Sequence, residues 1–204
     1  MSAALDGSVL SAVSRYWFGE LGGQWDYPVR ESAKWFNQSC TTDAEIAATF
    51  ARWLKSARDR VWQLDSLSRS EAVGLVVMLD QFPRNIFRGA AEAFAYDGAA
   101  LALAKQLISR RFADFFAIER VFLLLPFEHS EALVDQEAMM PLFAELAAAA
   151  PPEQSETYRR FEVFAEKHRA LIRRFGRFPH RNAVLGRVST PEEAAFLAEN
   201  GRGF

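Results

Sequence analysis

Apolar residues recur at helical spacing along most of the chain, and no window sustains the strict alternation expected of a strand. The clearest case is the segment from residue 155 to residue 175, where an apolar stripe follows one helix face. The stripe contains Phe161, Phe164, His168, Leu171, Ile172 and Phe175. Gly176 stands where a helix C-terminal cap is expected. The pattern therefore predicts an all-α fold, with His168 as a hydrogen-bonded core residue.

Capping boxes predict where several helices begin. In this motif a Ser or Thr hydroxyl and a Glu carboxylate three residues later satisfy each other's backbone N–H groups. It occurs at Thr42–Glu45, Ser68–Glu71 and Thr190–Glu193. Asp97 is a further candidate cap, for a helix over residues 98–110.

Glycine and proline predict where other helices end. Gly22 should stop a first helix over residues 9–21. Pro83 disfavours the α region at Phe82, so a helix over residues 72–81 should end there. Pro126 should stop a helix over residues 119–125, and Pro141 should kink or restart one over residues 131–150. Together these boundaries predict an antiparallel bundle or superhelix of roughly 8–10 helices. We expect these helices to form one domain over residues 1–204.

Composition narrows the class of protein. Half of the residues are hydrophobic and 18 are Phe, which suits a globular core. The formal net charge is only -2, so no basic field indicates a nucleic-acid partner. The apolar runs fall well short of the roughly 20 residues that span a membrane. One cysteine, Cys40, and an N-terminus without a signal-peptide pattern favour a cytoplasmic location.

Three polar motifs stand at predicted helix ends, where loops on a rigid scaffold commonly carry function. They are Leu79–Gly89 (LDQFPRNIFRG), Leu125–Glu131 (LPFEHSE) and Arg174–Asn182 (RFGRFPHRN). With Tyr16–Glu20, 93–97 and 173–193, these motifs make the chain resemble a bacterial family of unknown function. The resemblance covers nearly the whole chain. It implies an all-helical fold similar to the tetratricopeptide-like superhelix and supplies no activity, substrate or cofactor.

Charge is unevenly distributed between two segments. Residues 128–137 contain four acidic and no basic side chains, whereas residues 166–187 contain seven basic side chains and one acidic. In one interpretation the two segments pair and staple the helices together. In the other, Arg84, Arg177 and Arg181 converge on an anionic ligand.

Candidate chemistry is concentrated in the same motifs. Glu128 and His129 are the best candidates for acid–base catalysis, with Asp80 or Arg181 as partners from other motifs. The three histidines lack metal-ligand spacing, so no metal site is predicted, and no motif for a cofactor is found. His180 joins the candidate ligand-binding residues, and Asn85 and Asn182 are candidates either for ligand binding or for capping turns.

Three hypotheses follow. The first is a binding protein whose motifs line a groove for an anionic small molecule or a peptide carboxylate. The second is an enzyme that uses Glu128 and His129 for proton transfer, with Arg84, Arg177 and Arg181 stabilising charge. The third gives the motifs a purely structural role. A homo-oligomer stays open, because the tryptophans all lie between Trp17 and Trp62 and exposed aromatics cannot be told from core ones by sequence.

Overall fold

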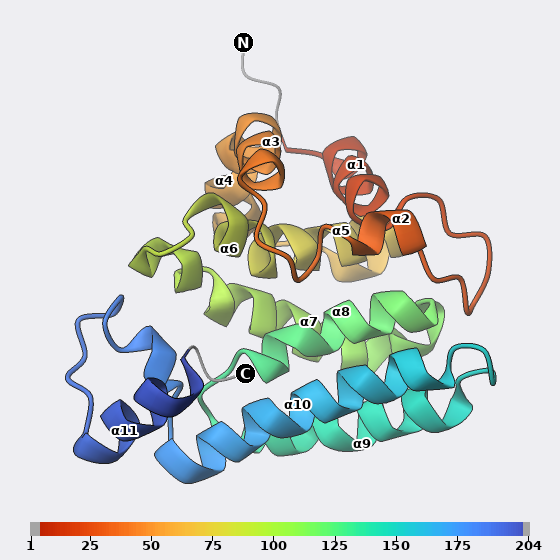
Figure 1. Ribbon diagram of the computed structural model, residues 1–204. Coiled ribbons are helices and arrows are strands. Elements are labelled where there is room, and N and C mark those ends of the chain that lie inside the picture. The colour runs from red at the N-terminus through yellow and green to blue at the C-terminus, as the bar shows by residue number, and fades with distance from the viewer. Residues whose placement is uncertain (1–4, 202–204) are drawn as a thin grey trace. The chain divides into compact units, whose positions relative to one another are not determined.

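The computed structural model describes residues 5–201, and every regular element in that range is a helix (Figure 1). The predicted all-α class is confirmed. Contacts divide the chain into two compact units. Unit 1 comprises residues 5–88 and 92–126, and unit 2 comprises residues 89–91 and 127–201. The single-domain organisation and the tetratricopeptide-like arrangement stay predictions.

Unit 1 is built around α5 (Arg69–Asp80), which is buried from Ala72 to Asp80. Four helices pack against it: α1 (Gly7–Phe18), α4 (Leu54–Asp59), α6 (Phe82–Ile86) and α7 (Asp97–Arg111). The remaining α-helices of the unit are α2 (Val29–Ser32), α3 (Cys40–Phe50) and most of α8 (Ala117–Glu128). Because α5 is apolar on all sides, it forms the centre of the unit.

The core of unit 1 is aromatic. The Phe122 ring centre lies 5.9 Å from that of Trp17, 5.0 Å from that of Phe18 and 4.8 Å from that of Trp35, with the rings edge to face in each pair. Such pairs add about 0.5–1.5 kcal/mol beyond their buried area. The early tryptophans Trp17 and Trp35 are therefore core residues.

Helices α1 and α5 approach each other closely at Gly74. A Cβ atom built on Gly74 would lie 2.1 Å from the carbonyl oxygen of Leu10. That separation is far inside van der Waals contact, so only glycine fits between the two helices at this point.

Unit 2 contains α9 (Leu133–Ala149), α10 (Ser155–Phe175), the short helix η5 (Pro179–Arg181) and α11 (Pro191–Asn200). Figure 1 shows α9 and α10 side by side. Glu137, early in α9, pairs with Arg169 at 3.1 Å and with Arg173 at 2.5 Å, late in α10. The two helices are therefore antiparallel.

Several predicted boundaries are confirmed. The helix over residues 155–175 and its glycine cap are as expected, with Gly176 at φ +70° donating to Ile172 O at 2.8 Å. The capping boxes at Ser68–Glu71 and Thr190–Glu193 are both present.

Other boundaries were wrong. Helix α8 continues through Pro126, because proline removes one N–H group but keeps a helical φ. The helix expected over residues 131–150, by contrast, is present as α9, with Pro141 inside it. Phe82 is helical: Pro83 lies in the first turn of α6, where its missing N–H costs nothing. The first helix ends at Phe18, because Gly19 turns the chain with φ +68°.

The capping box expected at Thr42–Glu45 was also wrong. Helix α3 begins at Cys40, and its cap is Ser39, whose hydroxyl accepts from Thr42 N at 3.2 Å. Glu45 instead accepts the hydroxyl of Tyr16 at 2.9 Å.

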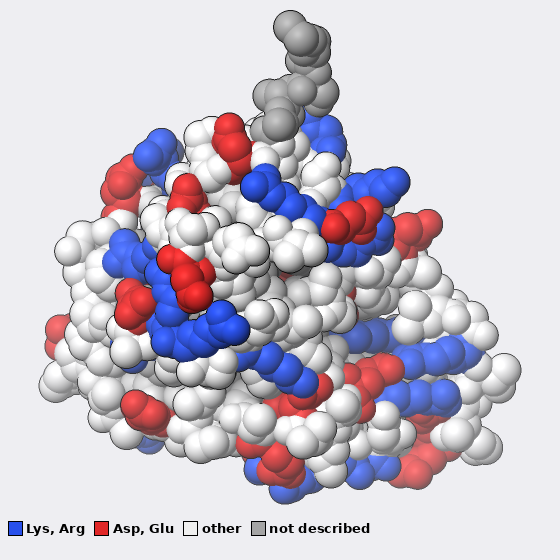
Figure 2. All heavy atoms as spheres, turned by 180° about the vertical axis from the view of Figure 1, so that it is seen from behind, with Lys and Arg blue, Asp and Glu red and all other residues white. Residues whose placement is uncertain are grey.

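Acidic and basic side chains are interleaved on the face shown in Figure 2. This intermixing agrees with the small net charge of the chain. Within residues 5–201, no helix is long and apolar enough to cross a membrane.

Candidate functional site

The segment that carries the second motif is fixed by one buried amide. The Gln136 Nε2 group donates to the carbonyl oxygens of Phe127, Glu128 and Ser130, at 3.2, 2.7 and 2.7 Å. These carbonyls belong to the end of α8 and the turn after it, which an α-helix leaves without intrahelical donors. Gln136 therefore holds Glu128 and the following histidine, His129, in place.

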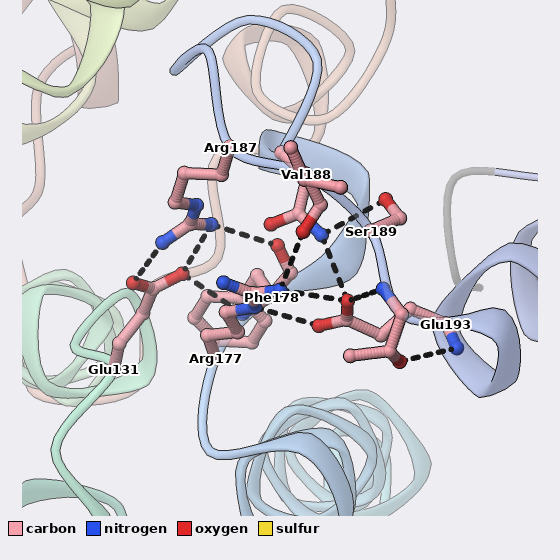
Figure 3. Close-up of polar contacts among 9 residues, drawn as sticks. Glu131, Arg177, Phe178, Arg187, Val188, Ser189 and Glu193 are labelled. Atoms are coloured by element: carbon pink, nitrogen blue, oxygen red, sulfur yellow. Dashed lines mark hydrogen bonds and ion pairs between the residues drawn. The ribbon is translucent and has the colours of Figure 1, made fainter.

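A second contact joins the second motif to the third. Glu131 accepts the backbone N–H of Phe178 at 2.8 Å and both terminal nitrogens of Arg187, at 2.7 and 3.0 Å (Figure 3). Arg187 also donates to Phe178 O at 3.1 Å. Burial alone would raise the pKa of Glu131, but these donors outweigh it and lower that pKa. We call this group, Glu131 with Phe178 and Arg187, the first clamp.

The second clamp anchors α11. Arg177 donates to both carboxylate oxygens of Glu193, at 2.6 and 2.8 Å, and Asn182 donates to the same carboxylate at 3.2 Å (Figure 3). Glu193 is 2% exposed, and it also accepts the Thr190 N–H of its capping box at 2.7 Å. The hydrogen bonds from Arg177 lower the pKa of Glu193 to about 2, so its charge persists in the fold.

The first clamp fixes the backbone of Phe178, and polar side chains lie around its ring. The ring centre lies 5.6 Å from that of His168 and 5.5 Å from that of His180, and the Arg181 guanidinium carbon lies 4.4 Å from it. The His129 ring lies 6.4 Å from the His168 ring. We call His129, His168, His180 and Arg181, together with Glu128, the histidine cluster.

His168 is the central member of this cluster. Its Nδ1 atom lies 2.9 Å from Phe164 O and 3.0 Å from Glu128 Oε1. Both neighbours are acceptors, so Nδ1 carries the proton of the neutral ring and Nε2 presents a lone pair. The hydrogen bond predicted for His168 is present, but its side chain is 14% exposed, so the residue lies at the edge of the core rather than inside it.

The pKa of His168 is lowered to about 3, chiefly by burial. The charges of His129, Arg181 and His180 contribute to this lowering, and the Phe164 carbonyl acts against it. The ring is therefore neutral at neutral pH. A neutral, carboxylate-oriented imidazole can accept a proton or bind an anion by becoming protonated.

The structure places the other candidate site residues in unit 1. Arg84 pairs with both oxygens of Asp97, at 2.9 and 3.0 Å, and reaches Asp80 at 3.6 Å. Asp97 is thus an ion-pair partner of Arg84 rather than the side-chain cap that we expected for α7. Asn85 donates to Asp43 Oδ1 at 2.8 Å.

Sequence reasoning did not select three residues that shape the site in unit 2. Glu131 counted only toward the acidic segment, and Glu193 was assigned only to a capping box. His168 was assigned to the core because it lies on an apolar stripe. A signal for Glu131 was present: the complementary charge of residues 128–137 and 166–187 predicted pairing, which the ion pair of Glu131 with Arg187 confirms.

No group of His, Cys, Asp or Glu side chains within residues 5–201 is arranged to hold a metal ion.

The fold and the site describe an all-helical protein with a buried, carboxylate-oriented histidine. The chain belongs to the bacterial family of proteins of unknown function designated DUF924, whose model matches residues 13–201. A solved structure, the protein of unknown function ATU0120 from Agrobacterium tumefaciens, is 32% identical to it with a TM-score of 0.77. That match covers 95% of this chain and 99% of that chain. No curated protein matches. The family expected from the three motifs is confirmed.

Proposed function

We propose that the protein binds a small anionic molecule at the histidine cluster of unit 2. The observation that carries the proposal is the convergence of nitrogen groups on His168. The His129 ring lies 6.4 Å from the His168 ring. His180 and Arg181 both contact the Phe178 ring, which in turn packs against His168. Among the residues assigned to the cluster, Glu128 is the single carboxylate. An anion would complement this excess of nitrogen groups.

Proton uptake should accompany binding. An anion beside a neutral imidazole stabilises its protonated form and so raises its pKa. Affinity for the anion should therefore rise as the pH falls. The two clamps have a different role. Their carboxylates are already paired with arginines, and the first clamp holds the backbone of Phe178 in place.

The test is calorimetry with inorganic phosphate and citrate as probes, at pH 6 and pH 8, in buffers of different ionisation enthalpy. We expect tighter binding at pH 6, with net proton uptake. The variant His168→Gln should lower the affinity roughly tenfold or more, the effect of one lost charge-assisted hydrogen bond. Arg160→Gln is the matched control, because Arg160 is exposed and pairs only loosely with Glu156 at 3.3 Å. Absence of binding to both probes, or an unchanged affinity in His168→Gln, would refute the proposal.

A second candidate is an enzyme that uses His168 as a general base. The contact between Nδ1 and Glu128 favours it, because it fixes the tautomer that leaves Nε2 basic. Glu128→Gln separates the two candidates. A binding protein should bind phosphate more tightly when this negative charge is removed. An enzyme should keep its ligand affinity and lose turnover, which can be followed with p-nitrophenyl acetate and p-nitrophenyl phosphate.

A further inference from the structure

Unit 1 contains a polar pocket that lies outside the three motifs. It has a volume of about 190 Å³ and is formed by α1 and the turn after it, the start of α5 and the start of α8. For comparison, a cavity of about 150 Å³ accommodates benzene. The pocket therefore has room for a molecule of roughly six to eight non-hydrogen atoms.

Glu119 brings a carboxylate to the wall of the pocket. Its side chain is 1% exposed, and its Oε2 atom accepts the Phe116 N–H at 2.9 Å. Burial raises the pKa of Glu119, although the Phe116 N–H and Arg69 act in the opposite direction. A cation or hydrogen-bond donor that reaches such a buried carboxylate stabilises its charged form.

Arg69 brings a positive charge next to that carboxylate. Its Nε atom lies 3.3 Å from Glu119 Oε2, and its guanidinium carbon lies 3.4 Å from the ring centre of Phe116. Stacking on Phe116 fixes the plane of the guanidinium. Nε is the guanidinium nitrogen closest to Glu119.

Serine hydroxyls supply the remaining polarity of the pocket. Ser14 is buried, and the hydroxyl oxygens of Ser11 and Ser70 lie 3.4 Å apart. A hydroxyl can donate to a carboxylate or accept from an ammonium group. At the rim, Arg15 and Glu20 form an exposed pair at 2.7 Å. Positive and negative side chains are thus balanced in the lining.

We infer that this pocket binds a small α-amino acid in its zwitterionic form. A balanced lining favours a ligand without net charge, because a net ion would be left without a counter-charge. The charges of Arg69 and Glu119 are adjacent, and an α-amino acid carries its two charges only two bonds apart. The ligand carboxylate faces the fork of Arg69, and the ligand ammonium group faces Glu119 and the serine hydroxyls.

The first test is titration of the whole chain with glycine, L-alanine and L-serine, followed by amide chemical shifts in NMR spectra. Acetate, methylamine and 4-aminobutyrate are the comparison probes, because they carry one charge or widely separated charges. We expect saturable shifts at α1 and at the start of α5. At least one amino acid should bind roughly tenfold or more tightly than any comparison probe, since both ends are then matched. Equal binding of acetate or methylamine, or no saturable binding of the amino acids, overturns the inference.

Variants supply the second test. Glu119→Gln keeps a side-chain oxygen for the Phe116 N–H but removes the charge, and it should weaken amino-acid binding roughly tenfold or more. Ser11→Phe should abolish binding by filling the pocket. The matched control is Asp65→Asn, which neutralises a carboxylate paired with Arg110 at the surface of the same unit, at 3.5 Å. If Glu119→Gln does not fold, Ser11→Phe and Ser70→Ala decide the question. Unchanged binding in Ser11→Phe excludes this pocket as the site.

Discussion

The two units are stabilised in different ways. In unit 1 the rings of Trp17, Phe18 and Trp35 surround Phe122, and burial of apolar area holds the helices together. In unit 2 the buried residues Leu171, Ile172 and Phe178 form one apolar cluster, and two carboxylate–arginine clamps stabilise the packing beside it. Hydrophobic burial responds weakly to pH, whereas clamps and buried histidines respond directly to it. We therefore expect acid to lower the stability of unit 2 before that of unit 1.

The largest effect should come from Phe122→Ala in unit 1. Removing a buried Phe side chain typically costs about 3–5 kcal/mol, because apolar burial is lost and a cavity remains. The free energy of unfolding in urea measures it. Val61→Ala is the control: Val61 is 84% exposed, and exposed substitutions usually change stability by about 0.5 kcal/mol or less. If the two variants lose the same free energy of unfolding, the aromatic core does not account for the stability of unit 1.

The next effect should come from Glu193→Gln in unit 2. The variant keeps the shape of the side chain but replaces the charge that Arg177, Asn182 and Thr190 contact. Amide hydrogens of α11 should then exchange roughly tenfold faster or more, the factor expected for one lost charge-assisted hydrogen bond. Exchange in α5 should not change. Equal acceleration in α5 and α11 would show that the clamp is not local to unit 2.

The smallest effect, counted per pH unit, should be the change in the free energy of unfolding that comes from His168. Its pKa is about 3 in the fold and near 6.5 in an unfolded chain. Below pH 6.5 the unfolded chain binds the proton and the folded one does not, so stability falls as the pH is lowered toward 3. The slope should approach roughly 1.4 kcal/mol per pH unit.

Urea unfolding between pH 7 and pH 4 measures that slope, and His168→Gln should flatten it. Glu128, His129, His180 and Arg181 face His168 and remain in the variant. A slope of the same size in His168→Gln would assign the pH dependence to one of them instead.

Local signals in the sequence predicted much of the fold. The helix over residues 155–175 and two of three capping boxes lie where expected, because these signals depend on residues three or four positions apart. Phe164 of the predicted apolar stripe is, however, 46% exposed. Proline was the weakest guide. Pro126 lies inside α8 rather than at its end, since packing of a helix can outweigh one missing hydrogen bond.

The candidate site was less predictable, because it depends on residues far apart in the chain. The contact between Glu128 and His168 spans 40 positions, and the apolar neighbours of His168 favoured a core role alone. In the structure this residue lies at the edge of the core and also has an ionisable neighbour. Likewise, Glu193 satisfies its own helix start and also pairs with Arg177, and only the first of these follows from local spacing.

The contact at Gly74 has a consequence for sequence variation. Every other amino acid carries a Cβ atom, and at this position that atom would overlap the Leu10 carbonyl oxygen. In a library that samples all residues along α5, position 74 should therefore reject even alanine. The neighbouring Val73 and Val76 are also buried, but they should accept other aliphatic residues of similar volume. Relatives that keep the α1–α5 crossing should carry glycine here, so this position marks the crossing in an alignment.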